Sequence, residues 1–389
     1  MHASHHLSGF FWLALVLLCL IALCACSSHP VSKVPANPAL ERVLAGQALL
    51  ATEELHWTLP DDRVMALNDD MHRFLAAYVP GGSDKQKLSD LLYAIMHQGL
   101  LGLTYNPHTT YTAADTFLHQ QGNCLSFTTM FIALAREVGL KAYFNEVDVP
   151  PVWDLQSEST YVVFKHINAV VNVGRERKVV DLNLENYDVD YQQRKLPDRQ
   201  AEAQYYNNRS MEHLYARNSR EAFRYLRKAI ELAPELDYLW SNLGTIYRRE
   251  GLLAEAEIAF HQALRLNPRS RLAASNLGRL YKQLGNDRRA AEYEQLVERF
   301  RLKNPYYRYH LAQTAVAEKD YRTALKHIRA AINAEDRDHR FHFLAANIYY
   351  ALDLPEQGRA SLQRAAKVTQ NSETQGRYRR KLNKLLALH

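Results

Sequence analysis

Cysteine is nearly absent from the body of this 389-residue sequence. Of the four cysteines, Cys19, Cys24 and Cys26 lie near the start, and only Cys124 lies beyond them. A disulfide framework is therefore excluded for the main part of the chain. The sequence also lacks a glycine-rich phosphate-binding loop and a cluster of residues with metal-ligand spacing. We therefore expect neither a cofactor nor a bound metal.

Charge is absent from the first 25 residues, which contain no Lys, Arg, Asp or Glu. Within them, Phe10–Leu23 is almost wholly apolar. This run is short for a bilayer span and has the length of the apolar region of a signal peptide. The alternative is an uncleaved membrane anchor.

The end of this run, Leu23-Cys24-Ala25-Cys26, resembles the processing site of a bacterial lipoprotein, although the front end lacks Lys and Arg. The resemblance implies a signal peptide over 1–25, a lipid on Cys26 and a proline-rich tether over 26–38. Ser27 behind the cysteine implies sorting to the outer membrane, facing the periplasm. Processing would remove Cys19 and Cys24 and lipidate Cys26, so Cys124 would be the one free thiol of the mature protein.

Small residues recur every 34 positions in the second half of the chain. One register is Ser210, Gly244, Gly278, Ala312 and Ala346, and two others run parallel to it. The fullest unit contains Trp240, Leu243, Gly244, Tyr247, Gly251, Ala256, Phe260, Ala263 and Pro268. This pattern resembles the tetratricopeptide repeat, a helix–turn–helix unit. It implies five repeats over 203–372 and a capping helix over 373–389.

The repeat region is basic, whereas the front of the chain is acidic. Residues 203–389 contain 33 Lys and Arg against 20 Asp and Glu, and residues 1–202 contain 15 against 22. Repeat arrays present concave surfaces that bind peptides or proteins, so we expect a protein or peptide partner, favourably an acidic one. The alternative is that the arginines only face solvent on the outer sides of the helices and bind no partner. We expect no nucleic-acid partner for an exported chain. His339 and His342 are expected to be solvated rather than metal-binding.

Residues 39–202 form a front domain with a different pattern. Helical spacing of apolar residues appears at 39–57 and 84–101, and a further helix follows Gly122-Asn123-Cys124. Asn123 is a good cap and Gly139 a good terminator for this helix. Cys124 therefore lies in the first turn, where amide N–H groups and the helix dipole favour a thiolate. A small thiol also packs well in such a position.

Two strands follow, at 161–173 and 178–185, joined by a turn. In the first strand, Ile167, Ala169, Val171 and Val173 share one face, while the opposite face carries His166. In the second strand Asp181 lies opposite the apolar face. Contact between His166 and Asp181 depends on the strand register, which the sequence does not give.

The joint pattern resembles the transglutaminase-like superfamily, related to the papain-like cysteine peptidases. It rests on GNC at a helix start, a strand histidine 42 residues after Cys124 and an aspartate 15 residues later. The resemblance implies an α+β domain, with helices packed on an antiparallel sheet. It also implies Cys124 as nucleophile, His166 as general base and then acid, and Asp181 as the residue that orients His166. Asn183 is a rival orienter.

One position departs from that family: many relatives have an aromatic residue two after the histidine, where this chain has Asn168. Asn168 and Trp153 are candidates for substrate contact, and Trp153 is equally a candidate for a core position. The sequence thus predicts a thiol-dependent amide hydrolase, or less favourably an acyltransferase, whose repeats recruit substrate or a partner. The alternative is a lipid-anchored repeat scaffold whose front domain is catalytically inactive.

Overall fold

This computed structural model describes residues 38–50, 58–148, 165–181 and 190–386. Its contacts divide the chain into two units, one ending at Arg42 and one beginning at Val43. The short helix α2, Pro38–Ala45, crosses that division. All further description concerns the unit that begins at Val43. The predicted signal peptide, Cys26 and most of the tether lie outside the described residues.

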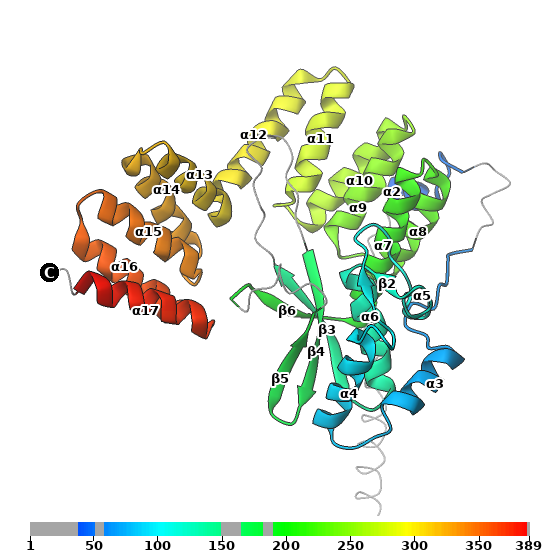
Figure 1. Cartoon of the computed structure of the whole chain (residues 1–389). Helices are drawn as coiled ribbons and strands as arrows, with labels where there is room; N and C mark the ends of the chain where they lie inside the picture. Colours follow the sequence, from blue (N-terminus) through cyan, green and yellow to red (C-terminus); the bar gives the residue numbers. More distant parts are fainter. Residues whose placement is uncertain (1–37, 51–57, 149–164, 182–189, 387–389) are drawn as a thin grey trace, which may run out of the picture. The chain divides into compact units, whose positions relative to one another are not determined.

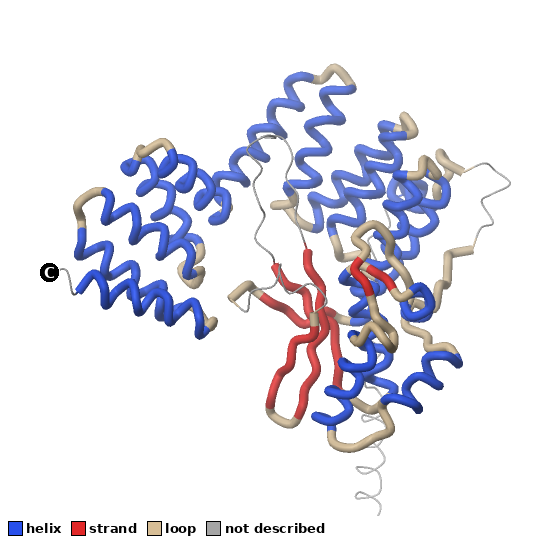
Figure 2. Tube along the Cα trace, viewed as in Figure 1, coloured by secondary structure: helices blue, strands red, loops and turns tan. Residues whose placement is uncertain are grey.

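The front of this unit combines helices with two sheets (Figures 1 and 2). The helices are α3 (Asp69–Tyr78), α4 (Asp84–Met96), α5 (Ala113–His119) and α6 (Cys124–Glu137). The strands are β1 (Thr104–Tyr105), β2 (Gln121–Gly122), β3 (Lys141–Asp148), β4 (Lys165–Val173), β5 (Glu176–Val180) and β6 (Gln193–Leu196). Strands β1 and β2 pair in parallel, whereas the other four form an antiparallel sheet of order β5-β4-β3-β6.

The hairpin β4–β5 turns over two residues, because Val173 pairs with Glu176. Gly174 adopts φ +60°, a conformation that favours glycine and permits so short a connection. Helix α6 contacts β3 and β4, and the Thr128 hydroxyl donates to the Ile167 carbonyl over 3.3 Å. The predicted helix–sheet layering is therefore present. On the hairpin face that carries His166, the β4 residues His166, Asn168 and Val170 are buried, whereas Asn172 is exposed.

Ten helices that follow the sheet in the sequence form five antiparallel pairs, and α17 packs on the last of them (Figure 1). Their bounds are α7 Asp198–Tyr215, α8 Ser219–Leu232, α9 Asp237–Arg249, α10 Leu253–Leu266, α11 Arg271–Gln283, α12 Asp287–Lys303, α13 Pro305–Ala317, α14 Tyr321–Ala334, α15 His339–Ala351, α16 Pro355–Val368 and α17 Ser372–Leu386. The five helix pairs span the region, 203–372, for which the sequence predicts repeats. The first helix begins five residues before the predicted boundary.

The turn inside each pair requires the left-handed backbone region. Gly251 and Gly285 have φ of +76° and +69° at this position. Arg217, Lys319 and Asp353 occupy the same position in the other pairs, with φ of +61°, +62° and +59°. The repeats that lack the turn glycine therefore keep its conformation, at the steric cost that a side chain imposes there.

Two glycines in the same repeat position differ in how closely the paired helix approaches. A Cβ added to Gly244 would lie 2.5 Å from the Phe260 ring, whereas one added to Gly278 would lie 3.6 Å from the nearest atom, Tyr293 Cβ. Gly244→Ala is therefore expected to destabilise the protein by about 1–3 kcal/mol through overpacking. Gly278→Ala is expected to stabilise it by about 0.5–1 kcal/mol, because alanine is the better helix former. Thermal unfolding midpoints that shift in the same direction for both variants would contradict this packing.

The front of the unit is joined to the first repeat by hydrogen bonds. Tyr205 Oη donates to Asp62 Oδ2 over 2.7 Å, and the Thr110 N–H donates to Glu212 Oε1 over 2.8 Å. Arg136 and Asp198 form a bidentate pair at 2.5 and 3.0 Å. The first repeat is therefore attached to the front of the unit through several side chains of α7.

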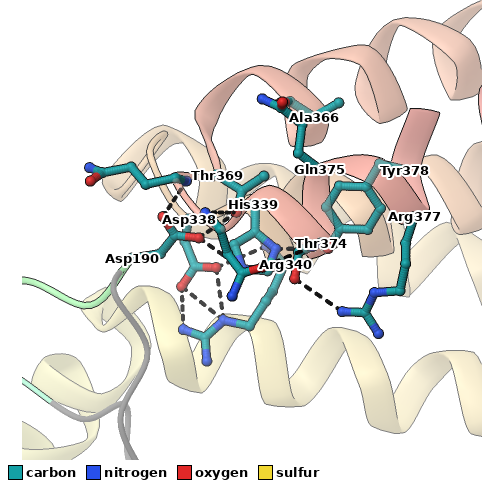
Figure 3. Close-up of polar contacts among 12 residues, drawn as sticks. Asp190, Asp338, His339, Arg340, Ala366, Thr369, Thr374, Gln375, Arg377 and Tyr378 are labelled. Carbon is teal, nitrogen blue, oxygen red and sulfur yellow. Dashed lines mark hydrogen bonds and ion pairs between the residues drawn. The ribbon is translucent and has the colours of Figure 1, made fainter.

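The segment before β6 also contacts the last repeat, next to α17 (Figure 3). Asp190 accepts a hydrogen bond from the Thr369 hydroxyl at 2.5 Å and another from the Gln370 N–H at 2.6 Å. His339 Nε2 lies 3.5 Å from the same carboxylate, and its Nδ1 is hydrogen-bonded to Tyr378 Oη at 2.7 Å. The front sheet is therefore connected to both ends of the repeat array.

Candidate active site

Cys124 is the first residue of α6, and its position is fixed by the cap before it. The Asn123 side chain accepts a hydrogen bond from the Ser126 N–H at 2.9 Å, as a capping asparagine does. Cys124 is a free, partly exposed cysteine. The predicted start of the helix is confirmed, and the thiol lies where the first-turn amides have no intrahelical acceptor.

Further hydrogen bonds join the start of α6 to the loop segment at residues 110 and 111. Asn123 Nδ2 donates to the Thr110 hydroxyl at 2.9 Å, and the Tyr111 N–H donates to the Ser126 hydroxyl at 2.8 Å. A Cβ added to Gly122 would lie 2.7 Å from Ser126 Cβ, so only glycine permits this close approach. These contacts restrain the backbone on either side of Cys124.

His166 and Asp181 meet as the resemblance predicts. His166 is in β4, and Asp181 follows the last residue of β5. His166 Nε2 lies 2.6 Å from Asp181 Oδ2, with both side chains largely buried. Nδ1 is then the ring nitrogen that Asp181 leaves for another partner, and Cys124 lies near enough to His166 to raise its pKa. The cysteine, histidine and aspartate therefore lie together at one site.

The environment of His166 favours the protonated ring. Burial alone would lower the pKa of His166, but the hydrogen bonds to Asp181 and Cys124, and the charges of both, outweigh it and raise the pKa to about 9. His166 therefore carries a proton at neutral pH. A protonated histidine beside a cysteine is the arrangement from which thiolate–imidazolium chemistry starts.

Asn168 is not the substrate-contacting residue that the sequence suggested. Its side chain has 0% exposure, and it donates through Nδ2 to Asp181 Oδ2 at 3.0 Å. A fully buried amide has no surface to offer a substrate, so this expectation is corrected. Trp153 and Asn183 lie outside the described residues.

Sequence reasoning missed Asn145, which is 1% exposed in β3 and bonds to Asn168. The available signal was the polar pair Asn145-Glu146 between the apolar residues Phe144 and Val147. A buried polar side chain in such a segment requires a hydrogen-bond partner. The partner itself is set by strand pairing, which the segment does not reveal.

His339 and His342 are buried, not solvated as expected, at 7% and 6% exposure. His339 is bonded to Tyr378, and His342 Nε2 donates to the Asp336 carbonyl at 2.7 Å. Across the described ranges, no group of three or more His, Cys, Asp or Glu side chains is arranged to hold a metal ion. In the same ranges, no helix combines the length and apolarity that a membrane crossing needs.

The first helices of the early repeats carry a linked row of polar side chains. Asn242 Nδ2 donates to Asn207 Oδ1 at 2.7 Å, and Arg279 donates to Asn276 Oδ1 at 2.9 Å. Burial lowers the pKa of Arg248, and the nearby positive charges of Arg279 and Arg249 lower it further. These arginines therefore repel one another, and an anionic ligand would relieve that repulsion.

Comparison with known proteins identifies the repeats. Models of the tetratricopeptide repeat match residues 203–236 and 237–270. Similar solved structures include MamA from Desulfovibrio magneticus RS-1, which is 16% identical to this chain. The match covers 44% of this chain and 96% of MamA, with a TM-score of 0.25. PilF of Pseudomonas aeruginosa has 19% identity, covers 49% of this chain and 94% of its own, and has TM-score 0.26.

YrrB, described as a TPR protein with an unusual peptide-binding site, is 18% identical to this chain. The match covers 46% of this chain and 92% of YrrB, with a TM-score of 0.24. With TM-scores this low, the structural likenesses add nothing to the family matches. No curated protein matches the chain. Two of the 34-residue units are thus matched by family models: the chain contains tetratricopeptide repeats, which generally bind protein or peptide partners.

Proposed function

We propose that this protein is a transglutaminase-like cysteine hydrolase that cleaves a peptide or protein amide through a thioester. The arrangement of Cys124, His166 and Asp181 carries the proposal, since the His166 ring is bonded to the Asp181 carboxylate and lies near the Cys124 thiol. The three also stand in the chain order of that superfamily. Asp181 holds the His166 ring by Nε2 and stabilises its positive charge.

In the first half of the reaction, the Cys124 thiolate attacks the amide carbonyl and forms a tetrahedral intermediate. The Cys124 N–H, free in the first turn of α6, donates to the oxyanion. His166 gives its proton to the leaving amine as the C–N bond breaks, and the acyl group remains on Sγ as a thioester.

In the second half, neutral His166 removes a proton from a water molecule that attacks the thioester carbonyl. The C–S bond breaks, the carboxylic acid leaves, and the thiolate and the imidazolium are restored. An amine in place of water would give acyl transfer. Hydrolysis is the proposed outcome because no described feature excludes water from the partly exposed thiol.

We further propose that the protein is a lipoprotein attached through Cys26 to the outer membrane, facing the periplasm. The apolar run and Leu23-Cys24-Ala25-Cys26 support this location. The repeats bind a protein or peptide and bring it to Cys124. An acidic partner is favoured by the basic balance of 203–389 and by the opposed arginines near Arg248.

A second proposal is a lipid-anchored scaffold in which the repeats carry the function and the front domain no longer turns over substrate. The two family matches favour it, since both fall on the repeats. In that case Cys124→Ala leaves every cellular function of the protein intact. Under the first proposal it removes function while partner binding persists.

The test compares the full chain with Cys124→Ala and His166→Gln, using p-nitrophenyl acetate as acyl donor and casein as protein substrate. We expect one equivalent of nitrophenolate in a burst, an acetyl group on Cys124 by mass spectrometry, and new casein termini with the wild type only. His166→Gln is expected to slow acylation at pH 7 by about 10⁴-fold. Acylation of Cys124 at equal rates in wild type and His166→Gln, without casein cleavage, would reject the enzyme and leave the scaffold.

A further inference from the structure

Asn168 is the cross-strand neighbour of Asp181. Ala169 pairs with Val180, so the next position in the same register sets Asn168 opposite Asp181. Side chains at directly opposed positions lie on one face and interact. His166 is two residues along the same strand and reaches the same carboxylate diagonally. One oxygen, Asp181 Oδ2, thus accepts from His166 at 2.6 Å and from Asn168 at 3.0 Å.

We infer that Asn168 is a positioning residue for Asp181, and that Asn145 and Arg177 fix the direction of its amide. The inference rests on the proposed function and deepens it. It concerns how the carboxylate behind His166 is held, at a position where relatives of the superfamily often have an aromatic residue instead.

The direction of the hydrogen-bond chain follows from its two ends. Arg177 has only donors, and its Nη2 donates to Asn145 Oδ1 at 3.1 Å. Asn145 must then present Nδ2 to its other neighbours, and it donates to Asn168 Oδ1 at 2.8 Å. Asn168 in turn presents Nδ2 to the carboxylate of Asp181, which only accepts.

A chain of two amides between a donor-only and an acceptor-only end has one consistent orientation. Asn145 and Asn168 are 1% and 0% exposed, so water does not offer an alternative arrangement to either side chain. Gln193 Oε1 supports the same orientation, since it accepts from Asn145 Nδ2 at 3.1 Å and from Arg177 at 2.9 Å. The network thereby fixes Asp181 relative to His166.

The substitution Asn168→Leu removes the donor to Asp181 with little change in volume. The carboxylate then loses one of its hydrogen bonds, and its orientation toward His166 relaxes. We expect alkylation of Cys124 by iodoacetamide at pH 7 to slow by about tenfold, read at that cysteine by mass spectrometry. Arg177→Met, an exposed change at the other end of the chain, is expected to act in the same direction with a smaller effect.

Two readouts separate positioning from a merely structural role. The downfield NMR signal of the His166 Nε2 proton, identified by its absence in His166→Gln, is expected to shift or broaden in Asn168→Leu. In an Asp181→Ala background, Asn168→Leu and Arg177→Met are expected to slow alkylation no further. An unchanged proton signal, or an equal slowing in the Asp181→Ala background, overturns the inference.

If circular dichroism shows that Asn168→Leu does not fold, the same two readouts are measured on Arg177→Met, and they decide whether the inference holds. The outcome is also separable from that of the proposed function. Wild-type alkylation no faster than in His166→Gln would reject the activated thiol. The His166 proton signal would still report whether Asn168 positions Asp181, because it does not depend on Cys124 turning over a substrate.

Discussion

Asp181→Asn is expected to reduce the rate of Cys124 acylation by p-nitrophenyl acetate by about 10³- to 10⁴-fold at pH 7. The carboxylate holds His166 Nε2 at 2.6 Å and is among the groups that raise the pKa of His166 to about 9. A neutral amide stabilises the imidazolium less and permits the wrong tautomer. The measurement is the burst rate of nitrophenolate release, taken from pH 6 to 10.

The matched control is Asp84→Asn, the same chemical change at an exposed position in the first turn of α4. It is expected to leave the burst unchanged. The NMR titration midpoint of His166 should also fall from about 9 toward the ordinary value near 6.5 in Asp181→Asn. A burst rate within tenfold of wild type, with the midpoint unmoved, would show that Asp181 does not act on His166.

The repeats could be predicted from the sequence because their information is local and repeated. Close helix pairing requires small residues, and the 34-residue spacing marks them five times. The conformation of the turns without glycine could not be predicted from the sequence. Arg217, Lys319 and Asp353 keep the left-handed conformation of the glycines they replace. Packing within each helix pair evidently determines the turn more strongly than the preference of its residue.

The candidate site was predicted in part. The cap at Asn123 and the alternation of β4 placed Cys124 and His166 correctly, because both patterns depend on neighbours in the chain. The contact with Asp181 depends on the register set by the two-residue turn, and the bond from Asn145 depends on pairing with a separate strand. Nothing in the sequence around Asn168 specifies that pairing, so the sequence does not reveal that this side chain is buried.

The sequence likewise predicts His339 and His342 on a solvated helix surface. In the structure both are buried, and His339 lies where the last repeat meets α17 and the segment before β6. A histidine on one helix gives no sign of what packs over it from distant parts of the chain. Long-range packing, rather than local propensity, therefore decided most of the errors.

The free energy of unfolding is expected to fall by about 3 kcal/mol more in the wild type than in His166→Gln as the pH rises from 6 to 10. The pKa of His166 is about 9 in the folded protein and near 6.5 when unfolded. A group whose pKa is raised by folding stabilises the folded state fully below its unfolded pKa. That stabilisation is lost as the pH rises through the folded pKa.

Urea unfolding followed by circular dichroism at pH 6, 8 and 10 measures the difference. Groups distant from His166 titrate alike in both proteins, so their contributions cancel in the comparison. His166→Gln should be the less stable protein at pH 6, and the two curves should converge by pH 10. Parallel curves would mean that the protonated ring gains nothing from Asp181 and Cys124 on folding. The ion pair from which the proposed chemistry starts would then be absent, because the contacts that hold His166 protonated for catalysis are the same ones that stabilise the fold.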